Sequence, residues 1–224
     1  MPEIRAVLFD ALGTLVRLEP PAPRLRAELR RATGVDVGDE AAERGFAAEI
    51  GFYLENHMRG GDEAGLEALR DDCAAVLHEA LGVEGLDRRA VRAGMLAALT
   101  FTAFPDAVPA LRAVRAAGLG AVVVSNWDRS LAGALDRAGL GDLVDGVVSS
   151  AEVGRAKPAP EPFRAGLELA GVPAAEALFV GDSADTDVEG AEAAGIRAVL
   201  VAREGPAPAG VEAIASLELL PSLF

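Results

Sequence analysis

The chain of 224 residues contains a single cysteine, Cys73, which excludes an intramolecular disulfide and a metal site built from several thiolates. Long hydrophobic runs are also missing, because the longest, such as 120–125, have the length of a strand and fall short of the roughly 18 to 20 residues that span a membrane. The N-terminus has no basic segment followed by a long apolar stretch. We therefore expect a cytoplasmic protein with no membrane partner.

Positive charge is scarce, since 21 Lys and Arg stand against 35 Asp and Glu and give a net charge of −14. Such a surface repels the phosphate backbone of nucleic acids, so we expect no nucleic-acid partner. The sequence assigns no oligomeric state. Twenty of the basic residues are Arg, and only Lys157 is Lys. Either this lysine survives by chance on the surface, or it occupies a site that needs a compact ammonium group instead of a planar guanidinium.

The order of apolar runs and amphipathic stretches predicts an α/β protein. Short apolar runs of strand length occupy 4–9, 119–124, 146–148, 177–180 and 197–202. Amphipathic stretches of helix length occupy 107–117, 130–138, 160–170 and 184–194. Glycines follow three of these stretches in positions typical of helix ends, at Gly118, Gly139 and Gly195. Strands that alternate with helices predict a doubly wound parallel sheet covered on both faces.

One connection is too long for a single crossover, because more than 110 residues separate Asp10 from Ser125. A whole strand-helix-strand unit needs only about 30 residues. We therefore expect an inserted helical domain at 18–99 and a core domain formed by 1–17 and 100–224. The proline-rich segment 20–23 of the inserted domain is predicted to be an entry linker. It is followed by predicted helices at 24–33, 39–58, 66–81 and 87–99.

Polar residues that could bind a ligand or take part in catalysis follow the predicted strands. Ligands of parallel α/β sheets bind beyond the carboxyl ends of the strands, where this sequence places Asp10, Ser125, Asn126 and Asp182. Together, Asp10 and the turn after it, Ala-Leu-Gly-Thr, offer a carboxylate, a flexible glycine and a hydroxyl. Clustered carboxylates at 182–187 are hard oxygen ligands of the kind that Mg²⁺ prefers.

These motifs together resemble the haloacid dehalogenase-like (HAD) hydrolase superfamily over essentially the whole chain. The first two motifs of the family are matched by Phe-Asp-Ala-Leu-Gly-Thr-Leu at 9–15 and Val-Ser-Asn at 124–126. The other two are matched by Lys-Pro at 157–158 and Val-Gly-Asp-Ser-Ala-Asp-Thr-Asp-Val-Glu-Gly-Ala at 180–191. The inserted segment is similar to the α-helical cap of the subgroup whose cap lies between motifs one and two. The resemblance implies a Rossmann-like core with a smaller cap domain.

The resemblance also implies the catalytic roles. Asp10 would attack phosphorus to form an aspartyl-phosphate that water then hydrolyses, and Thr14 would support Asp10 by a hydrogen bond. Lys157 would stabilise the nucleophile and the transferred group, while Ser125 and Asn126 would bind the phosphoryl oxygens. The expected partner is a small phosphorylated substrate.

A Mg²⁺ cofactor is implied in the same way. Asp10, the backbone carbonyl of Leu12 and Asp182 would hold the ion, with Asp187 in the outer shell or bound through water. The sequence supports this expectation only through its hard carboxylate ligands.

Position 12 departs from the family, because its phosphatases carry there a second Asp that protonates the leaving oxygen and this chain carries Leu12. A positioned acid is worth about 10² to 10⁴ in rate, so slow alkyl phosphates should be poor substrates. In one reading, the protein is a phosphatase for substrates with good leaving groups, or the cap supplies the acid from Tyr53, Glu55 or His57.

Two other readings of Leu12 stay open. A 2-haloacid dehalogenase also lacks the second Asp, because halide leaves without protonation. Against that reading, such enzymes carry neutral residues where Asp182 and Asp187 stand here, and their tyrosine after the lysine would correspond to Phe163. The last reading is a protein that has lost turnover and binds a phosphorylated ligand. A Mg²⁺-dependent phosphatase is the function that the sequence favours.

Overall fold

The computed structural model describes residues 3–224, and the chain divides into two compact units. The helical unit is Leu18–Thr100, and the core unit comprises the residues up to Arg17 together with Phe101–Phe224. Each unit has hydrophobic clusters of its own. The role of the helical unit as a cap over the site stays a prediction.

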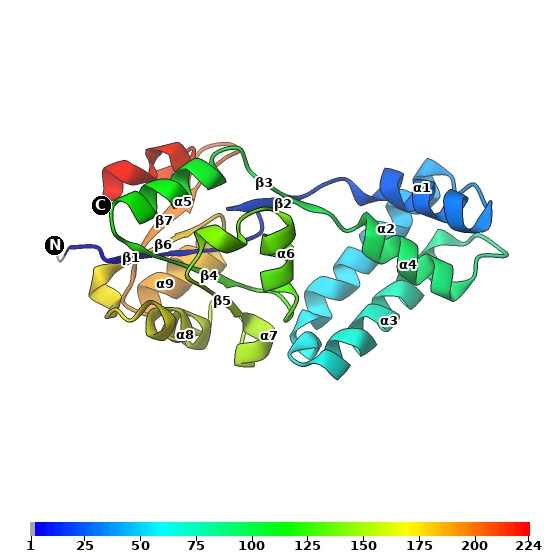
Figure 1. The fold of residues 1–224 in the computed structure, drawn as a ribbon, viewed down its shortest axis with the longest axis horizontal. Helices are drawn as coiled ribbons and strands as arrows, with labels where there is room; N and C mark the ends of the chain where they lie inside the picture. The colour runs from blue at the N-terminus through cyan, green and yellow to red at the C-terminus, as the bar shows by residue number, and fades with distance from the viewer. Residues whose placement is uncertain (1–2) are drawn as a thin grey trace. The chain divides into compact units, whose positions relative to one another are not determined.

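The core unit is built on a six-stranded sheet with β1 (Ala6–Phe9) in its interior (Figure 1). The strand order is β5-β4-β1-β6-β7-β8, and every pairing in it is parallel. The other strands are β4 (Gly120–Ser125), β5 (Gly146–Ser149), β6 (Ala177–Gly181), β7 (Arg197–Val201) and β8 (Ala213–Ile214). The predicted parallel α/β sheet is confirmed, although β8 was not expected.

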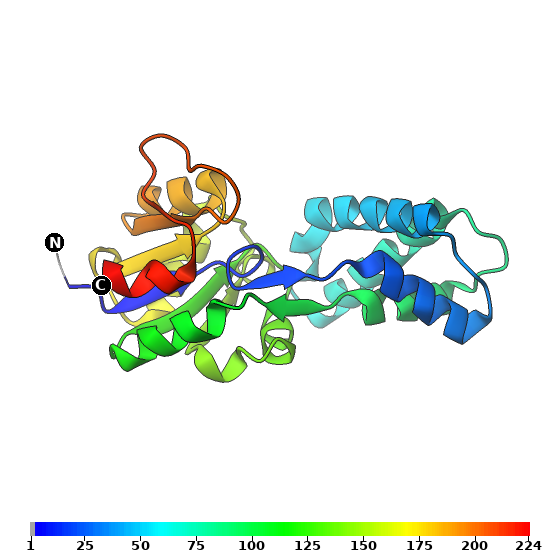
Figure 2. The same ribbon diagram turned by 90° about the horizontal axis from the view of Figure 1, so that it is seen from above.

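Helices cover both faces of this sheet, as the views in Figures 1 and 2 show. On one face, Val7 and Phe9 of β1 share a cluster with residues of α5 (Ala107–Ala116), α6 (Leu131–Arg137) and the 3₁₀-helix Leu217–Leu223. On the other face, Leu8 shares a cluster with residues of α8 (Pro160–Ala170) and α9 (Glu189–Ala193). Alternate side chains of β1 are thus buried on opposite faces, which explains its uninterrupted apolar run.

The remaining helical segments of the core unit are short. They are α7 (Ser150–Val153), the 3₁₀ turns Gly141–Leu143 and Ala174–Glu176, and a π-helical turn Ala184–Val188. The stretch predicted as one helix at 184–194 is therefore a π-helical turn followed by α9. Gly118, Gly139 and Gly195 have positive φ angles of 76°, 76° and 80°, as expected of glycines at helix ends.

The helical unit contains four α-helices and a 3₁₀ turn, His57–Gly60. The helices are α1 (Pro21–Thr33), α2 (Asp39–Asn56), α3 (Glu63–Leu81) and α4 (Arg88–Ala98). Their apolar faces meet in a cluster that includes Leu25, Phe46, Leu77 and Met95. Across residues 3–224, none of the helices is long and apolar enough to cross a membrane.

The expected proline linker is wrong, because α1 begins at Pro21 and includes Pro23. The first-turn amides of a helix have no partner within the helix, so prolines there cost no backbone hydrogen bond. Ala22 and Leu25 in the first part of α1 are buried, so this segment packs as part of the helical unit.

A short two-stranded sheet, β2 (Val16–Leu18) with β3 (Phe101–Ala103), was also not predicted. It lies where the chain passes from one unit to the other and back. Hydrogen bonds from Phe104 N–H to the Leu15 carbonyl and from Glu19 N–H to the Thr100 carbonyl, both 2.9 Å, flank it. Strands of three residues leave no periodic signal in a sequence.

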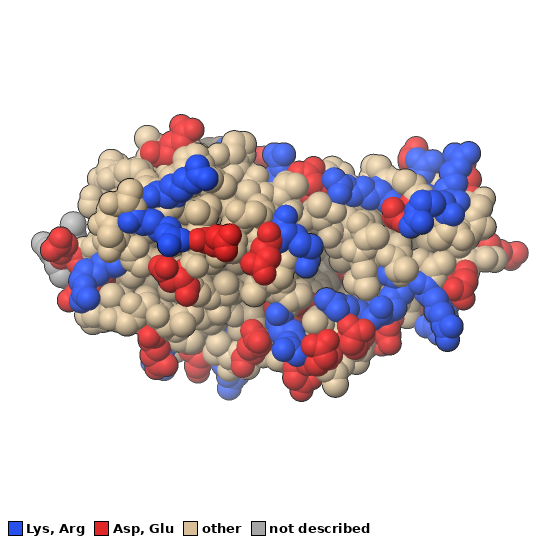
Figure 3. Space-filling view, in the orientation of Figure 1, with Lys and Arg blue, Asp and Glu red and all other residues tan. Residues whose placement is uncertain are grey.

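Charged side chains of both signs are interspersed on the face that Figure 3 presents. On the helical unit, Arg92 pairs with Glu67 at 2.5 Å and with Asp71 at 2.6 Å. Such exposed pairs contribute about 0 to 1 kcal/mol each, so they tune the surface and do not decide the fold.

Candidate active site

The first candidate residue, Asp10, directly follows β1 and is buried, with 6% of its surface exposed. Its backbone N–H donates to the Val180 carbonyl at 2.9 Å, which extends the parallel ladder by one residue. β4 and β6 flank β1 on its two sides, so Ser125 and Asp182 reach the same edge of the sheet. Residues more than 100 positions apart thereby come together, as expected for the carboxyl ends of parallel strands.

Lys157 is the buried cation of this site, and 2% of its side chain is exposed. Its ammonium group donates to Asp10 Oδ1 at 2.7 Å, to Asp187 Oδ1 at 2.6 Å and to the Val124 carbonyl at 2.9 Å. The three protons of an ammonium group are thus all engaged. Chance survival of this lysine on the surface is ruled out by its burial, and a compact point charge is what the site accommodates.

Ser125 and Asn126, paired in the sequence analysis, make different contacts. The Ser125 hydroxyl donates to Asp10 Oδ1 at 2.9 Å. The Asn126 amide faces the backbone of Lys157: its Nδ2 donates to the Lys157 carbonyl at 3.0 Å, and its Oδ1 accepts from the Lys157 N–H at 2.7 Å. Asn126 therefore fixes the loop that carries the lysine, a role that no signal in the sequence indicated.

The turn after Asp10 brings a glycine against a carboxylate. Gly13 has φ +86°, and a Cβ atom at this position would lie 2.1 Å from Asp182 Oδ2, so both the conformation and the space require glycine. Thr14 is buried, and its hydroxyl lies 3.5 Å from Asp182 Oδ1. We expected a contact with Asp10, whereas this contact is with Asp182. Leu12 in the same turn is 41% exposed.

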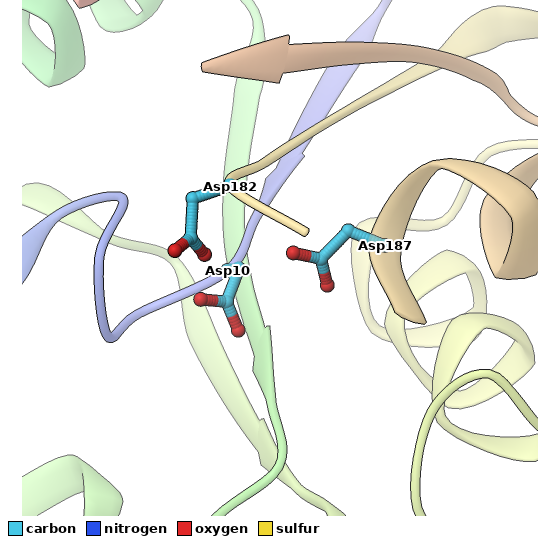
Figure 4. Close-up of side chains that lie close together, drawn as sticks. All are labelled: Asp10, Asp182 and Asp187. Atoms are coloured by element: carbon cyan, nitrogen blue, oxygen red, sulfur yellow. The ribbon is translucent and has the colours of Figure 1, made fainter. Parts of the chain in front are cut away.

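Three carboxylates gather at this edge of the sheet, as Figure 4 shows for Asp10, Asp182 and Asp187. Each offers an oxygen, and these oxygens lie within 4.8 Å of one another. Asp187 accepts from Lys157 through Oδ1 and from the Ser183 N–H through Oδ2 at 3.1 Å, so both of its oxygens are engaged. Asp182 is the exposed member of the cluster.

The close packing of these charges shifts their pKa values. Burial raises the pKa of Asp10, and the neighbouring Lys157 opposes that shift. Burial by itself would lower the pKa of Lys157, but the Asp10 and Asp187 carboxylates raise it, so the lysine stays protonated. Desolvation, followed by the negative charges of Asp10 and Asp187, raises the pKa of Asp182 to about 6.

The cluster therefore carries more negative than positive charge. Asp10, Asp182 and Asp187 face one ammonium group, and the charges of Asp10 and Asp187 add to desolvation in raising the pKa of Asp182. A hard divalent cation is the partner that such a set of oxygens suits best. Chemically, the arrangement offers an oriented carboxylate as nucleophile beside a fixed positive charge.

The candidate acids named in the helical unit lie on α2 and the turn after it. Tyr53 and Glu55 are on α2, and the Nδ1 atom of His57 lies 3.0 Å from the Leu54 carbonyl. The rings of Tyr53 and His57 are 6.0 Å apart between centroids. Their participation in chemistry stays a prediction.

Comparison with known proteins identifies the family of this chain. The model of the haloacid dehalogenase-like hydrolase family matches residues 4–195. The chain is 32% identical to haloacid dehalogenase-like hydrolase domain-containing protein 3 of Mus musculus, over 99% of this chain and 91% of that protein. It is 34% identical to a phosphoglycolate phosphatase of Cupriavidus necator, over 98% of this chain and 92% of the relative.

Solved structures with the same fold include both phosphatases and dehalogenases. A HAD phosphatase from Thermococcus onnurineus superimposes with a TM-score of 0.68 at 27% identity, over 98% of this chain and 97% of the other. A 2-haloacid dehalogenase from Pseudomonas syringae superimposes with a TM-score of 0.67 at 25% identity, with the same two coverages. By the family match, the similarity along its whole length and the fold, this chain is a hydrolase that belongs to the haloacid dehalogenase-like family.

Proposed function

We propose that the protein is a Mg²⁺-dependent phosphatase that acts on a small phosphorylated substrate through an aspartyl-phosphate on Asp10. The observation that carries the proposal is the charge arrangement at the sheet edge. Lys157 bonds to Asp10 and Asp187, while the third carboxylate, Asp182, has its pKa raised to about 6. The phosphatase among the relatives described above supports the same reaction class.

The residues fit a divalent cation. Asp10, Asp182 and the Leu12 carbonyl would hold Mg²⁺, and Asp187, whose two oxygens are engaged by Lys157 and Ser183, would act from the outer shell. When bound, the ion would neutralise the excess negative charge and withdraw electrons from the phosphoryl oxygens. An acidic cluster that was fully balanced by Lys157 would not need such a partner.

In the proposed reaction, a carboxylate oxygen of Asp10 forms a bond to phosphorus while the bond to the leaving oxygen breaks. The electron pair of that bond leaves with the oxygen. Water then attacks the aspartyl-phosphate, which releases inorganic phosphate and restores the carboxylate. Ser125 and Lys157 both hold Asp10 Oδ1, so they fix the rotation of the nucleophile, and Lys157 also balances charge on the transferred group.

Leu12 limits the substrates that this site can process quickly. Its apolar side chain is exposed in the turn that follows the nucleophile, where it cannot transfer a proton. Because a positioned acid is worth about 10² to 10⁴ in rate, the leaving group should be one that departs without protonation. We propose aryl or acyl phosphates as better substrates than alkyl phosphates.

A 2-haloacid dehalogenase is the second candidate, since a solved dehalogenase shares the fold and Leu12 is compatible with a halide leaving group. Attack at carbon requires a free carboxylate, and a bound cation would lower the nucleophilicity of Asp10. The carboxylates of Asp182 and Asp187 beside Asp10 therefore favour phosphoryl transfer.

The experiment is a substrate panel of aryl, acyl and alkyl phosphates and 2-haloacids, each assayed with Mg²⁺ and with a chelator. We expect phosphate release that depends on Mg²⁺ and is lost in Asp10→Asn, with no halide release from the 2-haloacids. Halide release without Mg²⁺ would establish the dehalogenase instead. Binding of phosphorylated compounds without turnover of any would identify a phospho-ligand-binding protein.

A further inference from the structure

Arg203, which follows β7 by two residues, makes a dense set of contacts that the catalytic assignments above do not use. Its Nε donates to the Gly13 carbonyl at 3.1 Å and one Nη to the Thr14 carbonyl at 2.7 Å. The two Nη atoms also donate to the two oxygens of Asp106 at 2.9 and 3.0 Å. One guanidinium group thus joins two successive carbonyls of the turn after Asp10 to a carboxylate at the start of α5.

The carboxylate that anchors this group is itself firmly held. Asp106 is 6% exposed, and its Oδ2 also accepts from the Ser216 hydroxyl at 2.8 Å and from the Leu217 N–H at 2.9 Å. Phe104 packs under the guanidinium, with the Arg203 Cζ atom 3.9 Å from the ring centroid. A bidentate pair on a partly buried arginine, stacked on an aromatic ring, has one defined geometry.

The turn that Arg203 contacts needs such support. Gly13 adopts φ +86°, and glycine has more accessible conformations than any other residue, so the turn is intrinsically flexible. Within the turn, Gly13 N–H donates to the Val16 carbonyl, and the Leu15 and Val16 amides donate to the Ala11 carbonyl, at 2.8 to 2.9 Å. The Gly13 N–H shares its peptide plane with the Leu12 carbonyl, so this bond also orients that carbonyl.

We propose that Arg203 is a positioning residue that holds the turn 11–15 in the conformation that Asp10 and Asp182 require, an inference that rests on the proposed function. By fixing the Gly13 and Thr14 carbonyls, it keeps the Gly13 backbone against the Asp182 carboxylate and the Leu12 carbonyl in its orientation. A lysine would supply the charge but not the fork that reaches Asp106 and both carbonyls together. Arg203 touches no reacting atom in this assignment.

The matched control lies at the other end of the same strand. Arg197, the first residue of β7, also forms a fork with one carboxylate, that of Glu212, at 3.0 and 2.5 Å. It also donates to one backbone carbonyl, that of Leu223, at 3.0 Å. Its side chain is 28% exposed, against 21% for Arg203. Arg203→Met and Arg197→Met therefore remove similar interactions, but only the first touches the turn.

The first measurement is native-state hydrogen exchange of the Gly13, Leu15 and Val16 amides in metal-free protein. We expect these amides to exchange at least about tenfold faster in Arg203→Met than in Arg197→Met at conditions of equal global stability, because local opening of the turn becomes easier. Equal exchange in the two variants would overturn the proposal. This readout decides the role of Arg203 even if the wild-type protein hydrolyses no phosphate ester.

The second measurement is the steady-state kinetics of aryl-phosphate hydrolysis with Mg²⁺. Because misplacement by about 1 Å costs as much as 10²-fold, we expect kcat to fall between about 10- and 100-fold in Arg203→Met with KM changed less than about threefold. Arg203→Lys should recover only part of kcat, and Arg197→Met should keep it. A kcat that is unchanged in Arg203→Met, or equally reduced in both methionine variants, would make Arg203 a structural residue only.

Discussion

The arrangement of hydrogen-bond acceptors around Lys157 determines which residue type this position accepts. Three oxygens from three segments of the chain surround its ammonium group at 2.6 to 2.9 Å, one of them a backbone carbonyl. A planar guanidinium has a fork geometry that cannot place one nitrogen at the common centre of these acceptors. In a chain with twenty arginines, the identity of this residue is therefore determined by local geometry.

Lys157→Arg tests this geometry. We expect the protein to fold and any phosphatase activity to fall at least about tenfold, somewhat over 1 kcal/mol in the barrier, because the larger cation displaces Asp10 or the phosphoryl group. The measurement is kcat/KM on an aryl phosphate, with the exposed Arg155→Lys in the same loop as the control. Unchanged turnover in Lys157→Arg would contradict the role proposed for this residue.

Leu12 provides a test of the proposed absence of a proton donor at position 12. In Leu12→Asp, we expect kcat/KM on an alkyl phosphate to rise at least about 10-fold, with an upper bound set by the roughly 10² to 10⁴ that a general acid supplies. An aryl phosphate should gain less, because its leaving group needs little protonation. Leu219→Asp adds the same charge at another exposed leucine and should change neither rate. Equal losses on both substrates in Leu12→Asp would argue against a missing acid at this position.

Asp182 should make the proposed Mg²⁺ binding depend on pH. Its pKa of about 6 in the metal-free site means that protons compete with Mg²⁺ below that pH, so the apparent affinity should fall by up to about tenfold per pH unit there. Above pH 7, where Asp182 is ionised, the affinity should be nearly constant. Calorimetric titration with Mg²⁺ between pH 5 and 8 measures this profile.

The matching variants are Asp182→Asn and Asp185→Asn. Asp185 is exposed in the same segment but does not belong to the carboxylate cluster, so its substitution should leave the profile intact. Wild-type affinity in Asp182→Asn would remove this residue from the proposed metal ligands.

At the scale of elements, helix α2 buries a carboxyl group in the helical unit. Glu49 is 3% exposed, and its side chain is hydrogen-bonded to that of Cys73 in α3. Burial raises the pKa of Glu49 to about 7. In an unfolded chain its pKa would be near 4.5. The folded protein therefore binds a proton more tightly than the unfolded chain, and stability from this group is lost as the pH rises from 4.5 through 7.

Glu49→Gln tests this linkage. The shift between about 4.5 and about 7 corresponds to roughly 3 kcal/mol at most, so the variant should gain up to that amount over wild type at pH 8 and little at pH 4.5. Urea unfolding at several pH values provides the free energies, and Glu43→Gln on the exposed side of α2 is the control. A difference between Glu49→Gln and wild type that does not grow with pH would refute the buried charge.

At the scale of the whole molecule, each unit has hydrophobic clusters built from its own residues. One cluster lies entirely within the helical unit, and the two clusters on the faces of the sheet lie entirely within the core unit. A domain with its own core can fold alone.

We expect a variant in which a short linker replaces residues 18–100 to unfold cooperatively and to keep the sheet domain. If the helical unit selects substrates, as the resemblance to capped hydrolases implies, the ratios of kcat/KM among phosphate esters should change. Circular dichroism during urea unfolding and the same substrate panel are the measurements. Unchanged preferences would show that the helical unit does not select substrates.

The sequence determined the features that depend on neighbouring residues. Apolar runs of strand length, amphipathic stretches and glycines such as Gly118 and Gly139 predicted the core elements, because these signals act within one element. The predicted strand ends placed Asp10, Ser125, Asn126 and Asp182 at one edge of the sheet, since parallel topology brings strand ends together. The lone lysine also indicated a special site before any contact was known.

Tertiary structure alone decided how those residues pair. Asn126 bonds to the backbone of Lys157, Thr14 approaches Asp182, and Arg203 reaches Gly13 across 190 positions. Pro21 and Pro23 are part of a helix for a similar reason, because burial of the first turn outweighs the local preference for a linker. Such contacts depend on sheet register and on the packing of distant segments, and no periodicity or short motif along the chain encodes them.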